Sequence, residues 1–309
     1  MLLRTTARRS AVAVVALTSA AVALTGCGGD SADSTGGAAA PASEALPTVT
    51  ADDALAAQVP DAVKSDGTIS VGTDSTYAPS EFLDADGETI VGFDIDLFTL
   101  VAQKLGLEAE FETADFSGII AGVGSGRYEA GVSSFTINPD RLAEATMVSY
   151  FSAGTQWATK KGNPEGVDPE DACGLAIAVQ EGTVQVDDLT ARSQACVDAG
   201  KPEITIDQYA GQDQATAAIV SGKDVAGLAD SPVMAYAVQQ TNEQLELLGD
   251  VYDSAPYGYV VPKDQTAFGE ALAGAVQALI DDGSYQAVLE KWGVEAGAIT
   301  DPTVNPTAG

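Results

Sequence analysis

The sequence predicts an α/β fold with parallel or mixed sheets. Short stretches with strand-like alternation of apolar residues, such as 68–74 and 176–180, are separated by longer stretches with helical periodicity, such as 92–106. Strands that alternate with helices are typical of sheets covered by helices. Polar side chains recur where predicted strands end, and ligands commonly bind at this edge of an α/β sheet. The 309 residues are enough for two domains.

The first half of the folded part begins with a strand and a turn. Its predicted elements are strands at 68–74 and 81–83, a helix at 92–106, a strand at 108–113 and a helix at 116–126. Residues 84–87 (Asp-Ala-Asp-Gly) are predicted to form a turn. They do not indicate calcium binding, because the spaced ligands and terminal Glu of an EF-hand loop are absent.

Residues 131–141 (GVSSFTINPDR) are predicted to form a strand end, a turn and the start of a helix. The Asn-Pro pair ends the strand and places proline in the first helical turn, where it is tolerated. This corner brings hydroxyl groups, free backbone N–H groups and the guanidinium of Arg141 together. Such a set can bind a carboxylate. For these residues alone, an ordinary surface arginine beside helix-capping hydroxyl groups is an equally simple interpretation.

The second half of the folded part repeats the alternation. Predicted strands lie at 176–180, 204–207, 226–230 and 257–261, and predicted helices open after 181–183 and cover 217–220, 268–282 and 285–292. Asp74, Thr183 and Asp230 fall at strand ends or in the turns just after them. We therefore expect these residues at the ligand-binding edge, together with the corner at 131–141.

Residues 1–26 are predicted to be a targeting segment. Three arginines precede a short apolar stretch at 11–23, which is too short to cross a membrane as a helix. Residues 24–27 (LTGC) resemble the bacterial lipobox, which implies a lipoprotein signal peptide, cleavage before Cys27 and lipidation of Cys27, palmitate included. The alternative is a generic secretion signal that happens to carry a cysteine.

Residues 27–52 are predicted to be a disordered tether that starts at the lipidated Cys27. They are rich in Gly, Ala, Ser and Pro and contain no aromatic residue, so they cannot bury enough apolar surface to order. We expect the tether to hold the folded part at the extracytoplasmic face of the cell membrane, with the lipid as its only membrane contact.

Two further cysteines, Cys173 and Cys196, remain when Cys27 is assigned to the lipid. An even pair in an exported protein favours a disulfide, which would close a loop of about two dozen residues and contribute about 3 kcal/mol. Two buried thiols and a metal-binding pair are the alternatives. Two cysteines without histidine make a poor zinc site.

The charge and composition exclude several classes of function. The chain has 45 acidic and 14 basic residues, a net charge of −31 and no histidine. Such a surface repels nucleic acid. The absence of histidine excludes histidine-based catalytic triads and histidine-ligated zinc. We expect no metal, no cofactor and no catalytic residue.

Seven stretches between residues 66 and 293 resemble the extracytoplasmic amino-acid-binding proteins of polar amino acid ABC importers (bacterial solute-binding protein family 3). They are 72–79 (GTDSTYAP), 92–97 (GFDIDL), 133–141 (SSFTINPDR), 180–183 (QEGT), 221–224 (SGKD), 229–232 (ADSP) and 282–292, which contains DGSY and KW. The resemblance implies the two-lobed periplasmic-binding-protein-like type II fold, with mixed sheets, flanking helices and a ligand cleft between the lobes. The expected lobes are residues 66–155 with 256–300, and residues 156–255.

The resemblance also implies nine ligand-binding residues: Asp74, Tyr77, Phe116, Ser133, Ser134, Thr136, Arg141, Thr183 and Asp230. Arg141 would hold the α-carboxylate of an amino acid, helped by Ser134, Thr136 and the turn at Thr183. Asp230 would hold the α-ammonium group. The two aromatic residues would enclose the side chain of the amino acid, and Asp74 would face its tip.

Each role has a simpler alternative. Asp230 fits the N-cap of a helix that starts at Ser-Pro, and Tyr77 and Phe116 fit core aromatic residues. Asp74 fits an Asx-turn that closes its own loop. Val184 stands where a second threonine is common in the family, which removes one hydroxyl group from the carboxylate site.

The implied function is to bind a free amino acid outside the cell, close the lobes around it and deliver it to an ABC permease, as a monomer. Arg141 and Asp230 would neutralise a zwitterion, which leaves Asp74 as a surplus negative charge. A buried unpaired charge is costly, so a basic amino acid is favoured, followed by an amide such as glutamine. The alternatives are a cyclohexadienyl dehydratase-like enzyme of the same fold and a sensory lipoprotein without a transport role.

Overall fold

The computed structural model describes residues 45–307, which form an α/β fold with two sheets. The strand order is β5-β1-β6-β11-β7-β10-β8-β9 in the large sheet and β2-β3-β4 in the small one. The strands are β1 (Thr68–Thr73), β2 (Thr76–Tyr77), β3 (Glu81–Leu83), β4 (Ile90–Val91), β5 (Glu108–Thr113), β6 (Ala130–Gly131), β7 (Ala145–Lys160), β8 (Ala176–Gln180), β9 (Thr205–Tyr209), β10 (Ala226–Asp230) and β11 (Leu245–Pro262). The helices are α1 (Asp53–Ala56), α2 (Asp61–Lys64), α3 (Phe93–Lys104), α4 (Phe116–Gly124), α5 (Pro139–Glu144), α6 (Val184–Asp198), α7 (Gln212–Ser221), α8 (Ser231–Gln240), α9 (Thr266–Asp282), α10 (Ser284–Trp292) and the 3₁₀ helix η2 (Glu295–Gly297).

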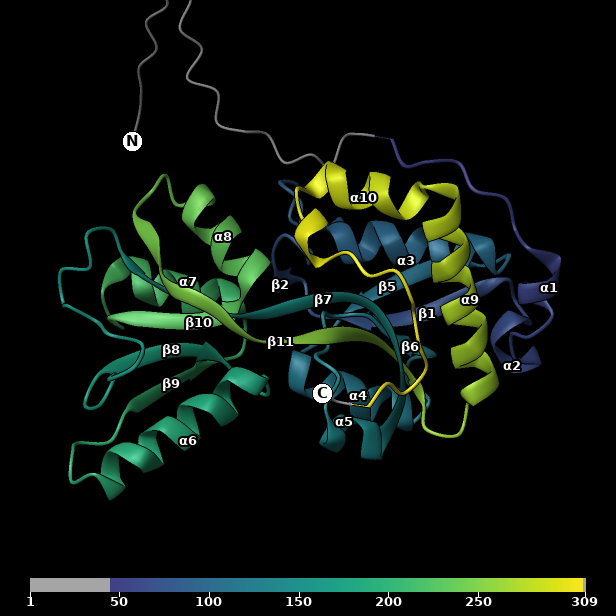
Figure 1. The fold of residues 1–309 in the computed structure, drawn as a ribbon. Coiled ribbons are helices and arrows are strands. Elements are labelled where there is room, and N and C mark those ends of the chain that lie inside the picture. The colour runs from purple at the N-terminus through teal and green to yellow at the C-terminus, as the bar shows by residue number, and fades with distance from the viewer. Residues whose placement is uncertain (1–44, 308–309) are drawn as a thin grey trace, which may run out of the picture. The chain divides into compact units, whose positions relative to one another are not determined.

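Two groups of parallel strands form two lobes, and the long strands β7 and β11 run through both (Figure 1). The first lobe contains β5, β1 and β6, and the second contains β10, β8 and β9. Strands β7 and β11 pair with each other in antiparallel register along most of their length. The predicted mixed sheet with flanking helices is therefore confirmed.

Each lobe has its own hydrophobic core. In the first lobe, helix α3 turns Phe93, Leu97 and Phe98 toward the sheet, at the helical spacing that the sequence predicted. In the second lobe, Trp157 and Leu189 belong to a separate core cluster. Each of these fully buried side chains contributes roughly 1.5–3 kcal/mol by leaving water. Packing in the two cores holds the strands in place, and the strand ends carry the residues that the sequence predicts to bind a ligand.

The pairing of β7 with β11 is irregular where the chain passes between the lobes. The register shifts between Leu248 and Tyr252 and again between Tyr252 and Ala255. The backbone of β11 packs tightly against Gly154 on β7, because a Cβ atom at this position would lie 2.5 Å from the carbonyl oxygen of Tyr252. The length of the two strands was not predicted, since the sequence indicated only 257–261 as a strand in this region.

A disulfide joins Cys173 to Cys196, with their Cα atoms 5.6 Å apart. It connects the segment before β8 to helix α6 and belongs to the outer part of the second core. The predicted pairing is therefore confirmed, and both alternatives, free thiols and a metal pair, are wrong.

The predicted signal peptide, the lipidated Cys27 and most of the predicted tether lie outside the described residues. Residues 45–52 have no helix or strand, but Leu46 and Val49 pack against the core of the first lobe. Asp52 then caps α1, accepting a hydrogen bond from Ala54 N at 2.8 Å. Within residues 45–307, no helix has the length and apolar character needed to cross a membrane.

Candidate functional site

A small cavity between the lobes is lined by seven of the nine residues that the sequence predicts to bind a ligand. These seven are Tyr77, Phe116, Ser134, Thr136, Arg141, Thr183 and Asp230. Gln180, Val184 and Gln185 complete the lining. The volume of the cavity is about 10 Å³, close to the space that one water molecule needs. The two lobes are thus closed on each other around this point.

Arg141 is placed by the corner that the sequence predicted at 131–141. Asn138 is the N-cap of α5 and accepts a hydrogen bond from Arg141 N at 2.9 Å. The guanidinium donates from Nη1 to the carbonyl oxygen of Thr136 at 2.8 Å. It also lies over the rings of Phe116 and Phe135, at 5.3 and 5.6 Å from their centroids. Burial lowers the pKa of Arg141 to about 10, so the guanidinium stays charged at neutral pH.

The guanidinium also reaches the second lobe. Nη2 of Arg141 donates to the carbonyl oxygen of Gly182 at 3.1 Å, in the turn between β8 and α6. Gly182 has φ +75°, and a Cβ atom there would lie 3.0 Å from the Cβ of Ser117. Thr183 follows at the N-cap of α6, and its hydroxyl donates to the carbonyl oxygen of Gln180 at 2.8 Å.

Asp230 ends strand β10 and is surrounded by donors. Its carboxylate accepts from Tyr257 Oη at 2.7 Å, Tyr77 Oη at 3.0 Å and Gln185 Nε2 at 2.8 Å. The residue occupies the N-cap position of α8, as the alternative interpretation proposed, but its side chain makes no capping hydrogen bond. Burial raises the pKa of Asp230, and the hydrogen bonds from Tyr257, Tyr77 and Gln185 act against this rise. The carboxylate faces the cavity and not the helix.

The carboxylate of Asp74 accepts four hydrogen bonds, all of them from neutral protein donors. Oδ1 accepts from Thr76 N at 3.0 Å and Thr76 Oγ1 at 2.6 Å, which is the predicted Asx-turn alternative. Oδ2 accepts from Phe116 N at 3.1 Å and, across the lobes, from Gln180 Nε2 at 2.8 Å. Burial nevertheless raises the pKa of Asp74. Asp74 lies beside the small cavity without lining it.

The hydroxyl groups of Ser133 and Ser134 are both used inside the first lobe. Ser133 Oγ accepts from Asp74 N at 3.0 Å and donates to Glu81 Oε1 at 2.9 Å. Ser134 donates from N and Oγ to Asp94 Oδ2, at 2.9 and 3.2 Å. Ser133 lies outside the lining of the small cavity and supports the site from behind, while Ser134 borders the cavity.

The two predicted aromatic residues are buried and also border the cavity. Tyr77 is 6 % exposed, and its hydroxyl both donates to the Asp230 carboxylate and accepts from Asp230 N. Phe116 stacks on Phe135, with centroids 4.8 Å apart and planes 19° apart. The alternative interpretation of Tyr77 and Phe116 as core aromatic residues accounts for their burial. It does not account for their position in the lining of the small cavity.

The sequence did not predict three residues that contribute to the site. Gln180, Gln185 and Tyr257 all bond to Asp74 or Asp230. Gln180 lies at the C-terminal end of β8 and Gln185 in the first turn of α6, so their positions at the binding edge were visible in the sequence. Tyr257 offers no such signal, because it lies inside a predicted strand.

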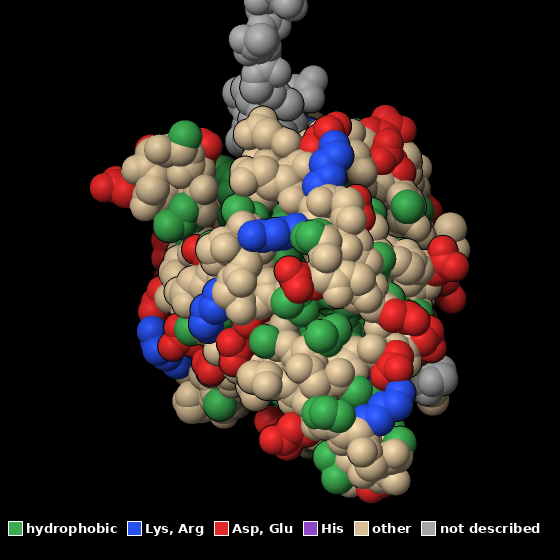
Figure 2. Space-filling model, turned by 90° about the vertical axis from the view of Figure 1, so that its left-hand side faces the viewer, with side chains coloured by type: hydrophobic (Ala, Val, Ile, Leu, Met, Phe, Trp, Pro, Cys, Tyr) green, Lys and Arg blue, Asp and Glu red, His purple; other side chains and the backbone are tan. Residues whose placement is uncertain are grey.

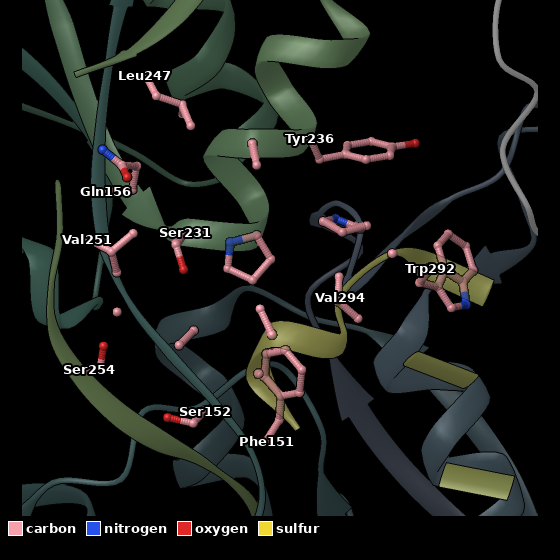
Figure 3. A pocket seen from close by; sticks show the side chains of 18 of the residues that line it. Phe151, Ser152, Gln156, Ser231, Tyr236, Leu247, Val251, Ser254, Trp292 and Val294 are labelled. Atoms are coloured by element: carbon pink, nitrogen blue, oxygen red, sulfur yellow. The ribbon is translucent and has the colours of Figure 1, made fainter. Parts of the chain in front are cut away.

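Two larger cavities lie nearby. One of about 440 Å³ lies beside Asp74, and its lining includes Asp115, Arg127 and Tyr128 from the first lobe and Gln214 from the second. Another of about 690 Å³ lies between α8, β11 and the segment that follows α10 (Figure 3). Its lining includes Tyr236, Val251 and Trp292 but no charged side chain among the described residues. It therefore lacks groups that could hold a carboxylate and an ammonium together.

Known proteins match this chain over most of its length. The arginine-binding protein ArgT of Corynebacterium glutamicum is 38 % identical over 252 residues, which cover 81 % of this chain and 82 % of that protein. A solved ancestral arginine-binding protein bound to arginine superposes with a TM-score of 0.66 at 32 % identity, covering 73 % of this chain and 98 % of the other. A solved ancestral amino acid-binding protein, a precursor of cyclohexadienyl dehydratase, superposes with a TM-score of 0.65 at 28 % identity, covering 75 % and 98 %.

A family assignment follows from the sequence match. The family of bacterial extracellular solute-binding proteins, family 3, matches residues 69–295, which include both lobes and both long strands. The matched region contains each of the nine residues predicted to bind a ligand. The chain belongs to the bacterial extracellular solute-binding proteins, family 3.

Proposed function

We propose that this protein binds a free amino acid outside the cytoplasm and delivers it to an ABC-type permease. The main support is the pair Arg141 and Asp230, which border one cavity from opposite lobes. A guanidinium suits an α-carboxylate and a carboxylate suits an α-ammonium group. The opposite charges of the pair complement a zwitterion, and neither lobe alone offers both.

The preferred ligand is a basic amino acid, with arginine first and an amide such as glutamine second. The 440 Å³ cavity beside Asp74 offers room for a long side chain, and Asp115 adds a second carboxylate to its lining. Asp74 accepts hydrogen bonds from neutral donors only, so it keeps its attraction for a cation. Asp and Glu side chains are spread over the face shown in Figure 2, and a net charge of −31 draws cations toward the protein.

Ligand entry requires the lobes to separate. Four sets of hydrogen bonds hold the closed form: Tyr77 to Asp230, Gln180 to Asp74, Arg141 to Gly182, and Gln212 N to Thr76 Oγ1 at 3.1 Å. The cavity they leave is too small for an amino acid. A bound amino acid would replace several of these bonds with its own, and closure then depends on its differential affinity for the closed form.

Catalysis is not part of this proposal. An enzyme of the cyclohexadienyl dehydratase kind needs an acid or base free to act on the substrate. Asp230 and Asp74 already accept three and four hydrogen bonds from protein donors. We therefore infer a binding protein and not an enzyme. We also propose that it acts as a monomer, and that a lipid on Cys27 and the tether at 27–52 hold it at the membrane.

Calorimetric titration of the purified protein tests the proposal. L-Arginine, L-glutamine and L-glutamate are titrated separately, with prephenate as a test of the enzyme alternative. We expect the tightest binding for arginine, weaker binding for glutamine and the weakest for glutamate. Tighter binding of glutamate than of arginine would overturn the ligand class, and turnover of prephenate would overturn the binding-only function.

A further inference from the structure

Two buried carboxyl groups lie within hydrogen-bonding distance of each other directly behind the binding site. Glu81 comes from β3 and Asp94 from the first turn of α3, and both are 0 % exposed. Two ionised carboxylates in such a place would repel each other and would both lose their hydration. A single proton shared by the two groups avoids this cost.

The hydrogen-bond partners of the two groups point to the same arrangement. Asp94 Oδ2 accepts from Tyr150 Oη at 2.6 Å and from Ser134 N and Oγ at 2.9 and 3.2 Å. Glu81 Oε1 accepts from Ser133 Oγ at 2.9 Å. The other two oxygens, Glu81 Oε2 and Asp94 Oδ1, are buried without a donor from any described residue. One proton held between these two oxygens would satisfy both.

Within residues 45–307, no ion pair joins a lysine or arginine to Glu81 or Asp94. Among these residues, the ionisable groups whose charges interact with the pair include Asp74 after β1, Tyr77 on β2, Tyr150 on β7 and Tyr259 on β11. Burial is the first cause that raises the pKa of Glu81 well above its usual range, and the charge of Asp94 raises it further. Burial also raises the pKa of Asp94, to about 6. Because Asp94 accepts more hydrogen bonds than Glu81, it is the better place for the negative charge.

We propose that Glu81 and Asp94 hold one proton between them at neutral pH, and that this pair positions the turn at Ser133 and Ser134 beside the ligand cavity. Ser134 has φ 49°, which is uncommon for a residue other than glycine. Its N–H and hydroxyl are held by Asp94, and the Ser133 hydroxyl links Glu81 to the backbone of Asp74. Loss of the proton would leave two carboxylates that repel each other, and the hydrogen bonds that hold the turn at Ser133 and Ser134 would weaken.

The pair acts on ligand binding only through this turn, so Glu81 and Asp94 are positioning residues. The binding readout rests on the proposed amino-acid-binding function. In Glu81→Gln, the amide can donate to Asp94 at every pH, and its oxygen can still accept from Ser133. Glu88→Gln is the matched control, because Glu88 is an exposed carboxylate between β3 and β4.

The first measurement is the affinity for L-arginine by calorimetry between about pH 6 and about pH 9, where loss of one proton weakens binding by up to about tenfold per pH unit. We expect wild type and Glu88→Gln to weaken as pH rises through the pKa of the pair. Glu81→Gln should bind as well as wild type at the acid end of this range and keep that affinity at the alkaline end. Parallel profiles for wild type and Glu81→Gln would overturn the positioning role.

The second measurement needs no ligand. Infrared spectroscopy of the purified protein at neutral pH should show the carbonyl stretching band of a protonated carboxyl group in wild type and in Glu88→Gln. The band should be reduced in Glu81→Gln and in Asp94→Asn, whose amide can donate to an ionised Glu81. A wild-type spectrum without the band overturns the shared proton even if a variant fails to fold. If arginine binds no form of the protein, the proposed ligand is wrong, while this band still tests whether Glu81 and Asp94 share a proton.

Discussion

The hydroxyl of Tyr77 and the acidic residue Asp230 form a two-way contact between the lobes. Tyr77 Oη donates to Asp230 Oδ2 at 3.0 Å and accepts from Asp230 N at 3.1 Å. The same carboxylate is the proposed receptor for the ammonium group of the ligand. The tyrosine hydroxyl thus bonds Asp230 at the point where the amino acid would bind.

Tyr77→Phe should therefore favour the open form of the ligand-free protein. The change removes two interlobe hydrogen bonds, each contributing about 0.5–1.5 kcal/mol, with more for the bond to a charged group. Small-angle scattering without ligand should give a larger radius of gyration than wild type. Tyr252→Phe is the control, because it removes the 2.7 Å bond to Asp188 within the second lobe. Equal radii for wild type and Tyr77→Phe would contradict the prediction.

Arg141→Lys should lose most of the affinity for an amino acid. Lysine keeps the charge but not the two-pronged geometry of the guanidinium, which now contacts both Thr136 and Gly182. A loss of about 1.5–3 kcal/mol is expected for a hydrogen bond to a charged group. Calorimetric titration measures this loss. Arg192→Lys, which alters a guanidinium bonded to Asp188 away from the cavity, should bind as wild type does.

Asp230→Asn should weaken ligand binding and alter the pH dependence of stability. Burial raises the pKa of Asp230 in the folded state, so the folded protein binds more protons than the unfolded chain between the ordinary Asp pKa and the raised one. The contribution of Asp230 to stability is therefore present at low pH and is lost as pH rises. Urea unfolding should show wild type losing free energy of unfolding relative to Asp230→Asn as pH rises from about 4. The opposite slope would refute the assignment.

Gly182→Ala should impair closure more than it impairs folding. Gly182 has φ +75°, and the new Cβ would press on Ser117 of the other lobe at 3.0 Å. Gly200→Ala is a matched control, because Gly200 has φ +72° and no atom lies within 4 Å of a Cβ added there. Both variants should lose about 1 kcal/mol of stability, since left-handed backbone disfavours alanine. Only Gly182→Ala should also lose ligand affinity, measured by calorimetry.

Reduction of the Cys173–Cys196 disulfide should lower the melting temperature. The bond spans 23 positions of sequence, and a loop of this size corresponds to about 3 kcal/mol. For a protein of this size, that free energy is equivalent to roughly 6–12 °C. Calorimetric scans with and without a reducing agent measure the difference. A double Cys→Ser variant should melt at the temperature of the reduced wild type, and its melting temperature should not change with the reducing agent.

Local patterns predicted the fold and the corner that holds Arg141, but not the partners of the acidic residues. Asn138 caps the helix that carries Arg141 three positions later, so this placement is contained in a few residues. Asp230 is different, because Tyr77 reaches it from 153 positions away in the chain. Asp74 is similar, since two of its four hydrogen bonds come from Phe116 and Gln180, which lie 42 and 106 positions away in the chain. A charge count along the sequence cannot include donors that only the fold brings close.

The two long strands also set the order in which the chain can be assembled during export. The first core needs α9 and α10, which follow β11, as well as α3, which precedes β7 (Figure 1). The second lobe is complete once the first part of β11 has paired with β7, because Leu245 and Leu248 pack in its cores. At that point the first lobe still lacks its last helices, α9 and α10. A chain that emerges from its N-terminus would therefore complete the later lobe first. The core of the first lobe would stay incomplete until α9 and α10 have emerged.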